Sequence, residues 1–472
     1  MTTDTRLVLT GRAIALALAA LLSGCAVGAD YTPPAVSNPP AYRFAEQTNQ
    51  AASLADAPWW QIFEDPTLQA LIRDAIANNL DLRTAVARVE EARARAGIAK
   101  SYLYPQVDGV LNYGGRQGSS SNESDDGSVR QTAGYGFQLS WELDLWGRLR
   151  RQQEAATALA LASEQGRRGV LVTLVGDVAT NYFLLRELDL QIEIARQTLK
   201  VNDDTVIYFR NRLEGGVSNR LELDRIQANR AQTAAAIPDI ERLAAVVENA
   251  LSLLLGRPPG GITRQSLGLK DDLPPPIPPG LPTTLLARRP DVLEAEQRLV
   301  AANADIGVAK ALFYPNISLT GFLGGVSGEL SSFLSTEGAV WSVGAGLLQP
   351  LFQAGRLRRN LEAAQARYDG ALAQYQKAAL NGYRETANAL VTIQKLAEMR
   401  EQRQLGVTAL QDASELSRER YDSGLASYIE ILTADEDLFE QQLLLAQVRG
   451  AELRARADLY RALGGGWQPV TP

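Results

Sequence analysis

The chain carries an internal duplication that spans most of its length. The segment around Pro105 returns around Pro315, 210 residues further on, and the string Gly-Arg-Leu-Arg-Arg at Gly147 returns at Gly355, 208 residues further on. Two more matching pairs follow in the same order and at nearly the same spacing. A chain duplicated on this scale builds a pseudo-symmetric structure, so the content of one copy describes the architecture of both.

The first 25 residues carry a targeting pattern. A short basic start leads into an apolar run, Ala13 to Leu22, which suits a secretory signal and is too short to span a bilayer. A short buried helix is the alternative interpretation of that run. The string Leu-Ser-Gly-Cys that ends at Cys25 resembles the bacterial lipoprotein box. The resemblance implies removal of residues 1–24 and lipidation of Cys25, and Ala26 after it favours the outer membrane.

The composition excludes several classes of function. The chain has no histidine and a single cysteine, so the usual zinc, haem and iron–sulfur ligand sets are absent, as are Ser-His-Asp and Cys-His catalytic sites. It has no Walker A string and no dinucleotide fingerprint. A net charge of −7 and a pI near 5.1 argue against nucleic acid as a partner. We therefore expect neither a cofactor nor an enzymatic activity.

Two segments in each copy have the period-two alternation of β-strands. The clearest begins at Tyr135, where one face consists of Tyr135, Phe137, Leu139, Trp141, Leu143 and Leu145 and the other is polar. Its partner strand spans 106–113, and the second copy offers 317–323 and 341–347. Alternation over about ten residues, with aromatic side chains near the ends, is typical of a strand that faces lipid. No apolar run of 18 residues follows the signal, so we expect strands to cross the bilayer; a half-buried sheet in a soluble sandwich is the alternative.

Four strands are too few to close a membrane barrel. Open strand edges are not tolerated in lipid, and the smallest outer-membrane barrels have about eight strands. Closure therefore requires several chains, and cyclic symmetry is the expected arrangement. Three chains would supply about twelve strands, but the sequence alone does not choose three over two or four.

Long helices follow the strand pairs. Residues 148–212 and 356–420 contain no proline, and helices of this length would extend roughly 100 Å. Apolar residues step by three and four along the second of them and form one stripe that would pack on neighbouring helices. The first helix of the chain should begin at Asp65-Pro66 and continue to about Tyr102. An ordinary two-stranded coiled coil is the alternative for the long helices.

The order of these elements resembles a known family. The duplication, the lipoprotein box and several short strings are similar to the TolC-like outer-membrane efflux factors, in particular their OprM-like lipoprotein branch. The matching strings are Trp59-Trp60, Phe63, Asp65-Pro66, Leu68 and Leu71, then Arg289-Pro290-Asp291, Ala295-Glu296, Leu299, Ile306-Gly307 and Phe313-Tyr314-Pro315. Each string is weak alone, and together they cover essentially residues 25–466.

The resemblance implies an α+β membrane protein. It would be an internally duplicated, trimeric outer-membrane β-barrel, with four strands per protomer, continuous with a long periplasmic α-helical barrel. Such a homotrimer would be the passive exit duct of a tripartite efflux pump for drugs or other small amphiphilic compounds. Its partners would be a periplasmic adaptor protein and an inner-membrane pump of the RND type. A channel for type I protein secretion is the alternative within this fold, and a structural periplasmic coiled-coil lipoprotein is the alternative of another class.

The duplication also divides the chain into parts. These are the lipoprotein signal peptide at 1–24, a lipidated extended arm at 25–64, a first repeat at 65–256, a proline-rich segment at 257–284, a second repeat at 285–464 and a tail at 465–472. Each repeat contains a helix, a strand pair, a long helix, a tip and a further helix. The strand pairs should lie near 105–146 and 315–352, and the tips near 213–220 and 421–428.

The tips concentrate the candidate functional residues. Gly216 and Gly424 lie where helices turn back, and glycine tolerates the left-handed conformation that such a turn needs. By the resemblance, these turns and Leu221 would meet the adaptor, and the second tip would form a periplasmic gate. The residues assigned to the gate are Tyr428, Ile429, Glu430, Thr433 and Glu436, with Arg420 or Arg225 as candidate salt-bridge partners.

The carboxylates at the second tip are the reason for expecting a gate there. A ring of carboxylates in a narrow pore attracts cations, and its members repel one another. The resemblance also places Ile429 at an apolar ring position. The sequence departs from its relatives at Thr433, where aspartate is common, and at Glu436, where arginine can occur. The resemblance would otherwise imply a latch at the tip formed by an arginine and an aspartate, and with these residues that latch is not expected in the form that the relatives have.

Overall fold

The computed structural model describes residues 26–36, 39–42, 44, 63–117, 129–264, 282–327 and 339–465. Several sequence predictions concern residues outside these ranges. They are the signal peptide at 1–24, the lipidation site at Cys25, the Trp59-Trp60 string, most of the proline-rich segment and most of the C-terminal tail. These remain predictions.

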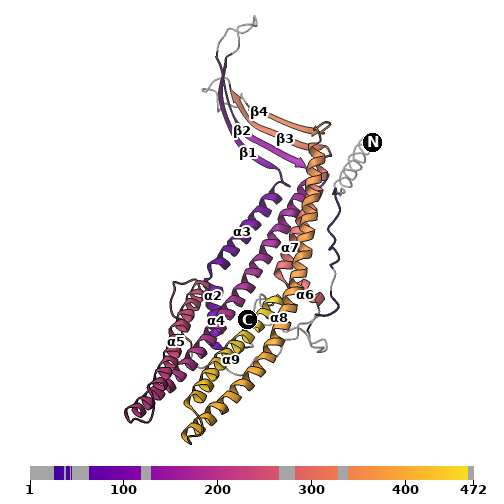
Figure 1. Ribbon diagram of the computed structural model, residues 1–472. Helices are drawn as coiled ribbons and strands as arrows, with labels where there is room; N and C mark the ends of the chain where they lie inside the picture. The colour runs from indigo at the N-terminus through magenta and orange to yellow at the C-terminus, as the bar shows by residue number, and fades with distance from the viewer. Residues whose placement is uncertain are drawn as a thin grey trace. The chain divides into compact units, whose positions relative to one another are not determined.

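The two repeats build matching series of elements (Figure 1). The first contains α2 (Pro66–Asn78), α3 (Leu80–Ser101), β1 (Gln106–Gln117), β2 (Val129–Leu143), α4 (Arg148–Glu214) and α5 (Arg220–Leu254). The second contains α6 (Pro282–Arg288), α7 (Pro290–Ala311), β3 (Asn316–Ser327), β4 (Ala339–Leu348), α8 (Arg356–Asp422) and α9 (Tyr428–Ala462). Both α4 and α8 have 67 residues, and both α5 and α9 have 35. The duplication in the sequence is therefore repeated element by element.

The elements divide between two compact units, each of which draws on both repeats. The strand unit contains the described parts of Met1–Ala35, Arg88–Glu164 and Glu294–Gln376. The helical unit contains the described parts of Val36–Ala87, Gln165–Leu293 and Lys377–Pro472. Because each unit combines halves of both copies, neither repeat is a compact domain by itself.

The first helix expected from the sequence is two helices. We expected one helix from Asp65-Pro66 to about Tyr102, but the structure interrupts it at Asn79, whose ψ of 130° is extended. The buried Asn79 side chain accepts a hydrogen bond from the Leu82 N–H at 2.9 Å and donates one to the Leu254 carbonyl at 2.9 Å. Asparagine is a favoured N-cap, so it starts a new helix here. The second bond joins residues 175 apart, which no local pattern could reveal.

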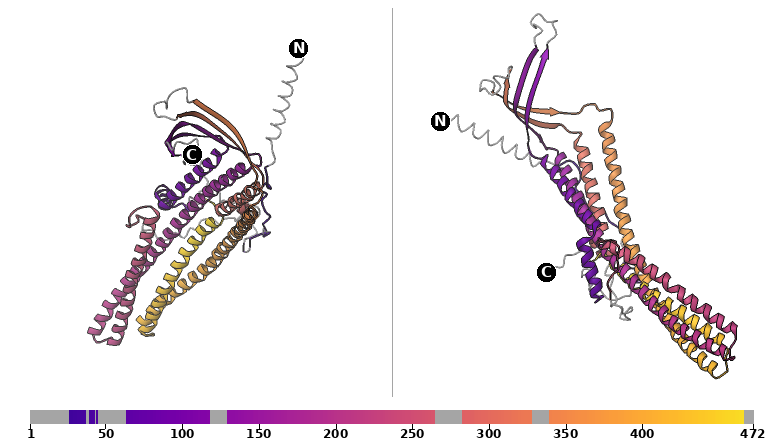
Figure 2. Two further views of the ribbon diagram at one scale, coloured as in Figure 1. Left: turned by 90° about the horizontal axis from the view of Figure 1, so that it is seen from above. Right: turned by 90° about the vertical axis from the view of Figure 1, so that its left-hand side faces the viewer.

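The four strands form one antiparallel sheet in the order β1-β2-β3-β4, and the sheet is arched in Figures 1 and 2. The two repeats meet in its middle, where β2 pairs with β3. The register places alternate residues of all four strands on one face, because residues opposite each other in a pair point the same way. This apolar face contains Val107, Leu111, Tyr135, Phe137, Leu139, Trp141, Ile317, Leu319, Leu323, Trp341, Val343 and Leu347.

Much of the apolar face is exposed in the protomer, and the rest of it is half-buried. Leu111 is 74% exposed, Trp341 76% and Val343 80%. The opposite face of the sheet is mostly polar and rich in glycine, with Asp108, Gln138, Ser140, Glu142, Ser318, Thr320 and Ser342. Within the described residues the outer edges of the sheet, β1 and β4, have no partner strand. β1 has 12 residues and β2 has 15. An apolar face of this extent on strands of this length is the arrangement expected for contact with lipid.

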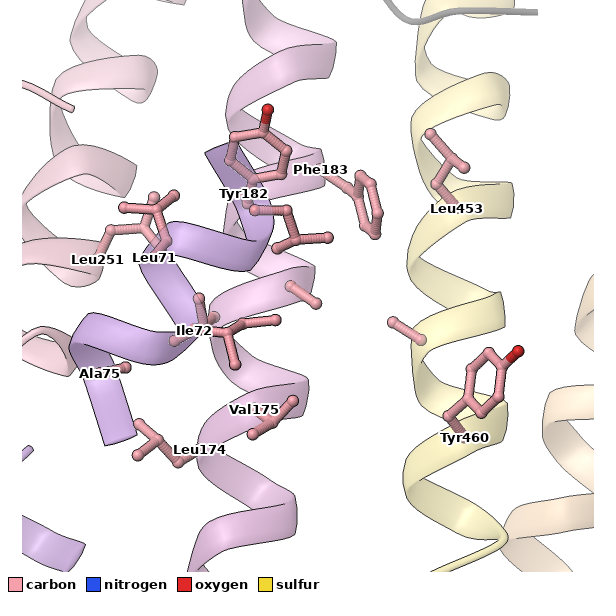
Figure 3. Close-up of a cluster of buried hydrophobic side chains, with 14 of the residues drawn as sticks. Leu71, Ile72, Ala75, Leu174, Val175, Tyr182, Phe183, Leu251, Leu453 and Tyr460 are labelled. Carbon is pink, nitrogen blue, oxygen red and sulfur yellow. The ribbon is translucent and has the colours of Figure 1, made fainter. Parts of the chain in front are cut away.

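The main hydrophobic core lies in the helical unit. Proline occupies the first position of α2, and the Asp65 carboxylate caps the helix by accepting hydrogen bonds from the N–H groups of Thr67 and Leu68. The buried face of α2 packs with α4, α5 and α9 around the residues labelled in Figure 3: Leu71, Ile72, Ala75, Leu174, Val175, Tyr182, Phe183, Leu251, Leu453 and Tyr460. The Tyr182 hydroxyl donates to Asp65 at 2.7 Å, which ties α4 to the start of α2.

One described helix, α4, is long and apolar enough to cross a membrane by length and composition alone. Its most apolar 18-residue window has a mean hydropathy of 1.2, although no uninterrupted apolar run of that length exists. Half of that window is buried against the protein itself. The window is therefore explained by the core described above, and it is weak support for a spanning helix.

Candidate functional site at the helix tips

Two helical hairpins end in matching turns. α4 and α5 form one hairpin, α8 and α9 form the other, and the two lie side by side in both views (Figures 1 and 2). Gly216 and Gly424 each have a φ of 72°, which glycine adopts without strain. The residue after each glycine donates its N–H to a carbonyl five residues back in the long helix. The Val217 N–H donates to the Arg212 carbonyl at 2.9 Å, and the Leu425 N–H donates to the Arg420 carbonyl at 2.8 Å. This Schellman motif satisfies carbonyls at the helix end and reverses the chain.

An aromatic cluster joins the two hairpins near the turns. Phe209 of α4 packs against Tyr428 of α9, with 4.3 Å between ring centroids, and against Tyr421 of α8 at 6.0 Å. The Arg212 guanidinium lies over the Tyr421 ring, 5.6 Å from its centroid. Aromatic pairs and cation–π contacts each contribute on the order of 0.5–1.5 kcal/mol. The cluster therefore fastens the tip of the first hairpin to the tip of the second.

Tyr428, one of the residues that the sequence assigned to the gate, lies inside this tip. Its side chain is only 8% exposed and belongs to an apolar cluster with Val206, Phe209, Leu223, Ile226 and Ile431. Burial raises the pKa of its hydroxyl, so the group stays neutral at physiological pH. Tyr428 is the first residue of α9, and the sequence alone did not show whether its side chain faces the neighbouring helices or the opposite side. Tyr428 packs the hairpins together.

The other residues assigned to the gate share an exposed face of α9. Their spacing of three and four residues puts Ile429, Glu430, Thr433 and Glu436 on one side of the helix, together with Glu440. All of them are exposed, and Ile429 retains 43% of its accessible surface. We call this the acidic stripe. It presents one apolar residue at the tip, followed by three carboxylates along the helix.

Arg420 lies beside the start of the acidic stripe. Its Nε is 3.8 Å from the Glu430 carboxylate, and both side chains are about half exposed. An ion pair in that setting contributes at most about 1 kcal/mol because water screens it. Arg225, the other candidate partner, is exposed on α5 and makes no ion pair in the part of the chain described above.

Two polar contacts at the tip were missed by sequence reasoning. Asp435 accepts hydrogen bonds from Arg418 at 2.9 and 3.0 Å and from the Ser414 hydroxyl, which ties α9 to α8. Glu436 accepts a hydrogen bond from the Asn229 amide of α5 at 2.9 Å, which ties the second hairpin to the first. The helical period would have placed Asp435 off the exposed face of α9, but its partners come from another helix and no local pattern names them.

The turns themselves expose apolar side chains. Val217 and Leu221 are each 65% exposed, and Leu425 is 72% exposed. Among the described residues no group of three or more acidic, cysteine or histidine side chains is placed to hold a metal ion. The tip is thus chemically suited to contact another protein through its apolar turns and to repel or attract ions through its acidic stripe.

Comparison with known proteins gives these features a context. A family model described as outer membrane efflux protein matches residues 71–257 and 281–465, one match in each repeat. The chain is 34% identical over 456 residues to the cation efflux system protein CusC of Escherichia coli O6:H1, covering 96% of this chain and 98% of that one. It is 34% identical over 459 residues to the solvent efflux pump outer membrane protein SrpC of Pseudomonas putida, covering 95% and 96%.

A solved structure matches the fold as a whole. The outer-membrane channel OprN superposes with a TM-score of 0.87 at 32% identity, covering 94% of this chain and 100% of that one. The fold class expected from the sequence is thereby confirmed: an internally duplicated α+β fold of trimeric outer-membrane channels, in which each protomer contributes four strands. The soluble sandwich and the plain coiled coil are excluded, because neither has this combination of elements.

Proposed function

We propose, from the premise that this chain belongs to the outer membrane efflux protein family, that it is the passive exit duct of a tripartite pump. Family membership itself makes the chain an outer-membrane efflux channel. The proposal adds the partners, the lipid anchor, the cargo and the gate. Export through such a duct requires no catalytic residue in this chain, because the inner-membrane pump supplies the energy.

One observation carries the channel assignment. The apolar faces of all four strands are continuous through the register of the sheet, and their residues are exposed or half-buried in the protomer. The sheet nevertheless ends in two unpaired edges, β1 and β4, among the described residues. In a bilayer an unpaired edge is costly because its N–H and C=O groups find no water, so the sheet must close with further copies. A homotrimer closes it with about twelve strands.

The proposed partners are assigned to the two parts of the protein that they would contact, the membrane-facing strands with Cys25 and the helix tips. Lipidation of Cys25 would hold the channel in the outer membrane, together with the lipid-facing strands. A periplasmic adaptor protein would meet the exposed apolar turns at Gly216, Leu221 and Gly424. An inner-membrane pump of the RND type would then deliver cargo to the helical end of the duct.

We propose small amphiphilic organic compounds as the cargo. By their names, CusC serves cation efflux and SrpC serves solvent efflux. The present chain has two methionines, one cysteine and no histidine, so it provides no set of soft ligands for a copper or silver ion. This favours the organic class. Deleting the gene should raise the accumulation of a lipophilic dye and leave copper and silver tolerance unchanged. The opposite pattern would reassign the cargo to cations, and loss of a secreted protein alone would indicate type I secretion.

The proposed gate is the acidic stripe on α9. Replacing Glu430 and Glu436 with alanine should change single-channel conductance and reduce cation selectivity in planar bilayers, because carboxylates in a narrow pore attract cations. Asp239→Ala is the matched control, since Asp239 is an exposed carboxylate on α5 whose partner is its helical neighbour Arg242. A double variant that conducts and selects as the wild type does would place the stripe outside the lumen.

A further inference from the structure

The junction between the strands and the long helix has the same arginines in both repeats but not the same acids. The Gly-Arg-Leu-Arg-Arg string that leads into α4 returns before α8, 208 residues later. At the same spacing Glu142 returns as Pro350, and Asp144 returns as Phe352. The second repeat has therefore kept its arginines and lost two carboxylates that precede them.

In the first repeat those two carboxylates bind the arginines. Glu142 accepts two hydrogen bonds from the Arg148 guanidinium, at 2.9 and 2.7 Å. Asp144 accepts one from the Arg150 guanidinium at 3.3 Å and one from the Arg150 backbone N–H at 2.9 Å. The first junction thus contains its own anions, and they neutralise the arginines at short range.

In the second repeat the equivalent arginines lack those two acids. Arg356 donates to the uncharged side chain of Gln353 at 2.9 and 2.6 Å. Arg358 pairs with Glu362 at 3.1 Å, but Arg359 shares the same carboxylate at 2.6 Å. Among the described residues of this junction, three guanidinium groups therefore face one carboxylate. Because Arg358 is largely exposed, water weakens its ion pair and an external anion can compete for it.

Exposed apolar side chains lie beside these arginines, where β4 leads through a short loop into α8 (Figure 1). Leu351 and Phe352 are 91% and 87% exposed. β4 has 10 residues. At about 3.3 Å per residue and a tilt of roughly 40°, such a strand covers about 25 Å, the height of the apolar band of an outer-membrane barrel. The loop after β4 then lies at the level of the lipid headgroups, where an apolar surface bordered by basic side chains binds anionic lipid.

We propose that Leu351, Phe352, Arg356 and Arg358, here called the junction patch, bind an anionic phospholipid of the membrane leaflet on the side of the long helices. The two guanidinium groups contact the phosphate, because their planar donors match its geometry. The two apolar side chains contact the first carbons of the acyl chains. The inference rests on the proposed function, because it assumes that lipid surrounds the strands.

The first repeat indicates that the junction patch stays accessible in an oligomer. The side chains of Arg148 and Arg150 remain 27% and 42% exposed, although the adjacent Trp146 stacks on a tyrosine of the second repeat. An oligomer of duplicated chains offers the second junction a similar neighbour. Arg356 and Arg358 should therefore keep a comparable exposure in the channel.

Lipid binding to the purified channel tests the proposal. Native mass spectrometry of the wild-type oligomer would measure the affinities for dioleoylphosphatidylglycerol and, separately, dioleoylphosphatidylcholine. We expect the anionic lipid to bind more tightly, and Arg356→Gln and Arg358→Gln each to weaken its binding by about fivefold. Binding of the zwitterionic lipid should change little. Equal wild-type affinities for the two lipids, or full affinity for the anionic lipid in both variants, would overturn the site.

Two arginines serve as matched controls. Arg150 is the equivalent of Arg358 and has the Asp144 carboxylate beside it, and Arg242 is an exposed arginine of α5 that pairs with Asp239. Neither Arg150→Gln nor Arg242→Gln should alter the affinity for phosphatidylglycerol. A loss in Arg150→Gln as large as that in Arg358→Gln would contradict the role given to the missing acids.

The apolar half of the junction patch has its own test. Phe352→Ala should weaken both lipids by a similar factor, because contact with an acyl chain does not depend on the headgroup charge. Millimolar inorganic phosphate should not displace phosphatidylglycerol from the wild type. Displacement by phosphate alone, with no effect of Phe352→Ala, would show a site for free phosphate and overturn the lipid site.

The same spectra separate this inference from the function on which it rests, because they also report the oligomeric state. Wild-type oligomers that conduct in bilayers but show no lipid preference would overturn the junction patch and leave the channel assignment intact. Oligomers that dissociate in Arg356→Gln without a change in lipid preference would place that residue in a subunit interface and overturn the patch. A monomeric, non-conducting wild type would overturn the proposed function, and a preference of that monomer for the anionic lipid would still support the patch.

Discussion

The middle segments of α4 and α8 occupy equivalent places in the two repeats and have different surroundings. Tyr182, Leu185 and Glu187 of α4 are all buried in the helical unit. Their equivalents 208 residues later are Leu390, Ile393 and Lys395, of which the first two are half-buried and the third is exposed. The covering element differs as well: α2 has 13 residues and packs on α4, whereas α6 has seven. A duplicated sequence therefore produced two helices that both contribute to the core but are buried to different depths at equivalent positions.

The difference teaches that the helical period and the depth of burial are separate properties. Both helices carry an apolar stripe, and both are 67 residues long. How deeply each stripe is buried depends on elements far away in the sequence, which cover the middle of α4 more completely than the middle of α8. α8 is thus the helix with surface left over for another subunit or for the duct, and α4 is the helix that stabilises the protomer.

The largest expected effect contrasts two equivalent core positions. Tyr182→Ala should lower the free energy of unfolding by about 4 kcal/mol, because it leaves a large cavity and removes the hydrogen bond from the Tyr182 hydroxyl to Asp65. Leu390→Ala should cost roughly 1–2 kcal/mol, since that side chain is only half-buried. Denaturant unfolding of the purified channel in detergent would measure both. Equal losses would contradict the contrast, and Tyr182→Phe isolates the hydrogen bond from the packing.

The second contrast concerns a buried ion pair. The Glu187 carboxylate is buried and pairs with Arg454 of α9, whereas Lys395 at the equivalent position forms only an exposed pair with Glu398. Arg454→Met should cost about 3 kcal/mol at neutral pH, because it leaves a buried carboxylate without its cation. Lys395→Met should change the free energy of unfolding by less than about 0.5 kcal/mol.

The loss in Arg454→Met should depend on pH. Burial raises the pKa of Glu187 above its ordinary value of 4.5, even with Arg454 beside it. An acid whose pKa is higher in the folded state binds more protons folded than unfolded, so its contribution to stability falls as pH rises above 4.5 through the folded pKa. Without Arg454 the folded pKa rises further, so that fall is larger and extends to higher pH. The deficit relative to wild type should be largest near neutrality and shrink as pH approaches 4.5; a deficit that is constant with pH would refute this origin.

The third contrast uses two helical glycines whose replacement by alanine should change the free energy of unfolding in opposite directions. A Cβ at Gly450 of α9 would overlap the Glu187 side chain, whereas a Cβ at Gly406 of α8 would meet nothing within 4 Å. Gly450→Ala should therefore destabilise the protein by about 2 kcal/mol through overpacking. Gly406→Ala should stabilise it by roughly 0.5–1 kcal/mol, because alanine favours a helix. The midpoints of denaturant unfolding should move in opposite directions; movement in the same direction would mean that α9 can shift away from α4.

The smallest effect concerns the break between α2 and α3. Asn79→Ala removes the cap of α3 and the hydrogen bond to the Leu254 carbonyl, and should cost about 1.5 kcal/mol. Thr84→Ala is the matched control in the same helix, because its exposed hydroxyl bonds only to its own helix at Leu80. The control should lie within about 0.5 kcal/mol of wild type. Indistinguishable variants would mean that the break does not depend on the cap.

Much of the tip was accessible from the sequence, and its internal contacts were not. Gly216 and Gly424 could be named because a left-handed helix end calls for glycine, a local requirement. The exposed stripe of Ile429, Glu430 and Glu436 follows from a helical period alone. The burial of Tyr428 could not be foreseen, because the residue that covers it, Phe209, comes from a helix more than 200 residues earlier.

The sequence by itself determined the duplication, the alternation of the strands and the length of the helices. Each of these depends on residues within a few positions of one another, where period and propensity act. The tertiary structure alone decided that β2 pairs with β3, that the middle of α4 is buried more deeply than the middle of α8, and that Asn79 divides the first helix. Those outcomes depend on contacts between distant segments. Because the two repeats have similar local sequences, those sequences do not show which repeat another element will cover.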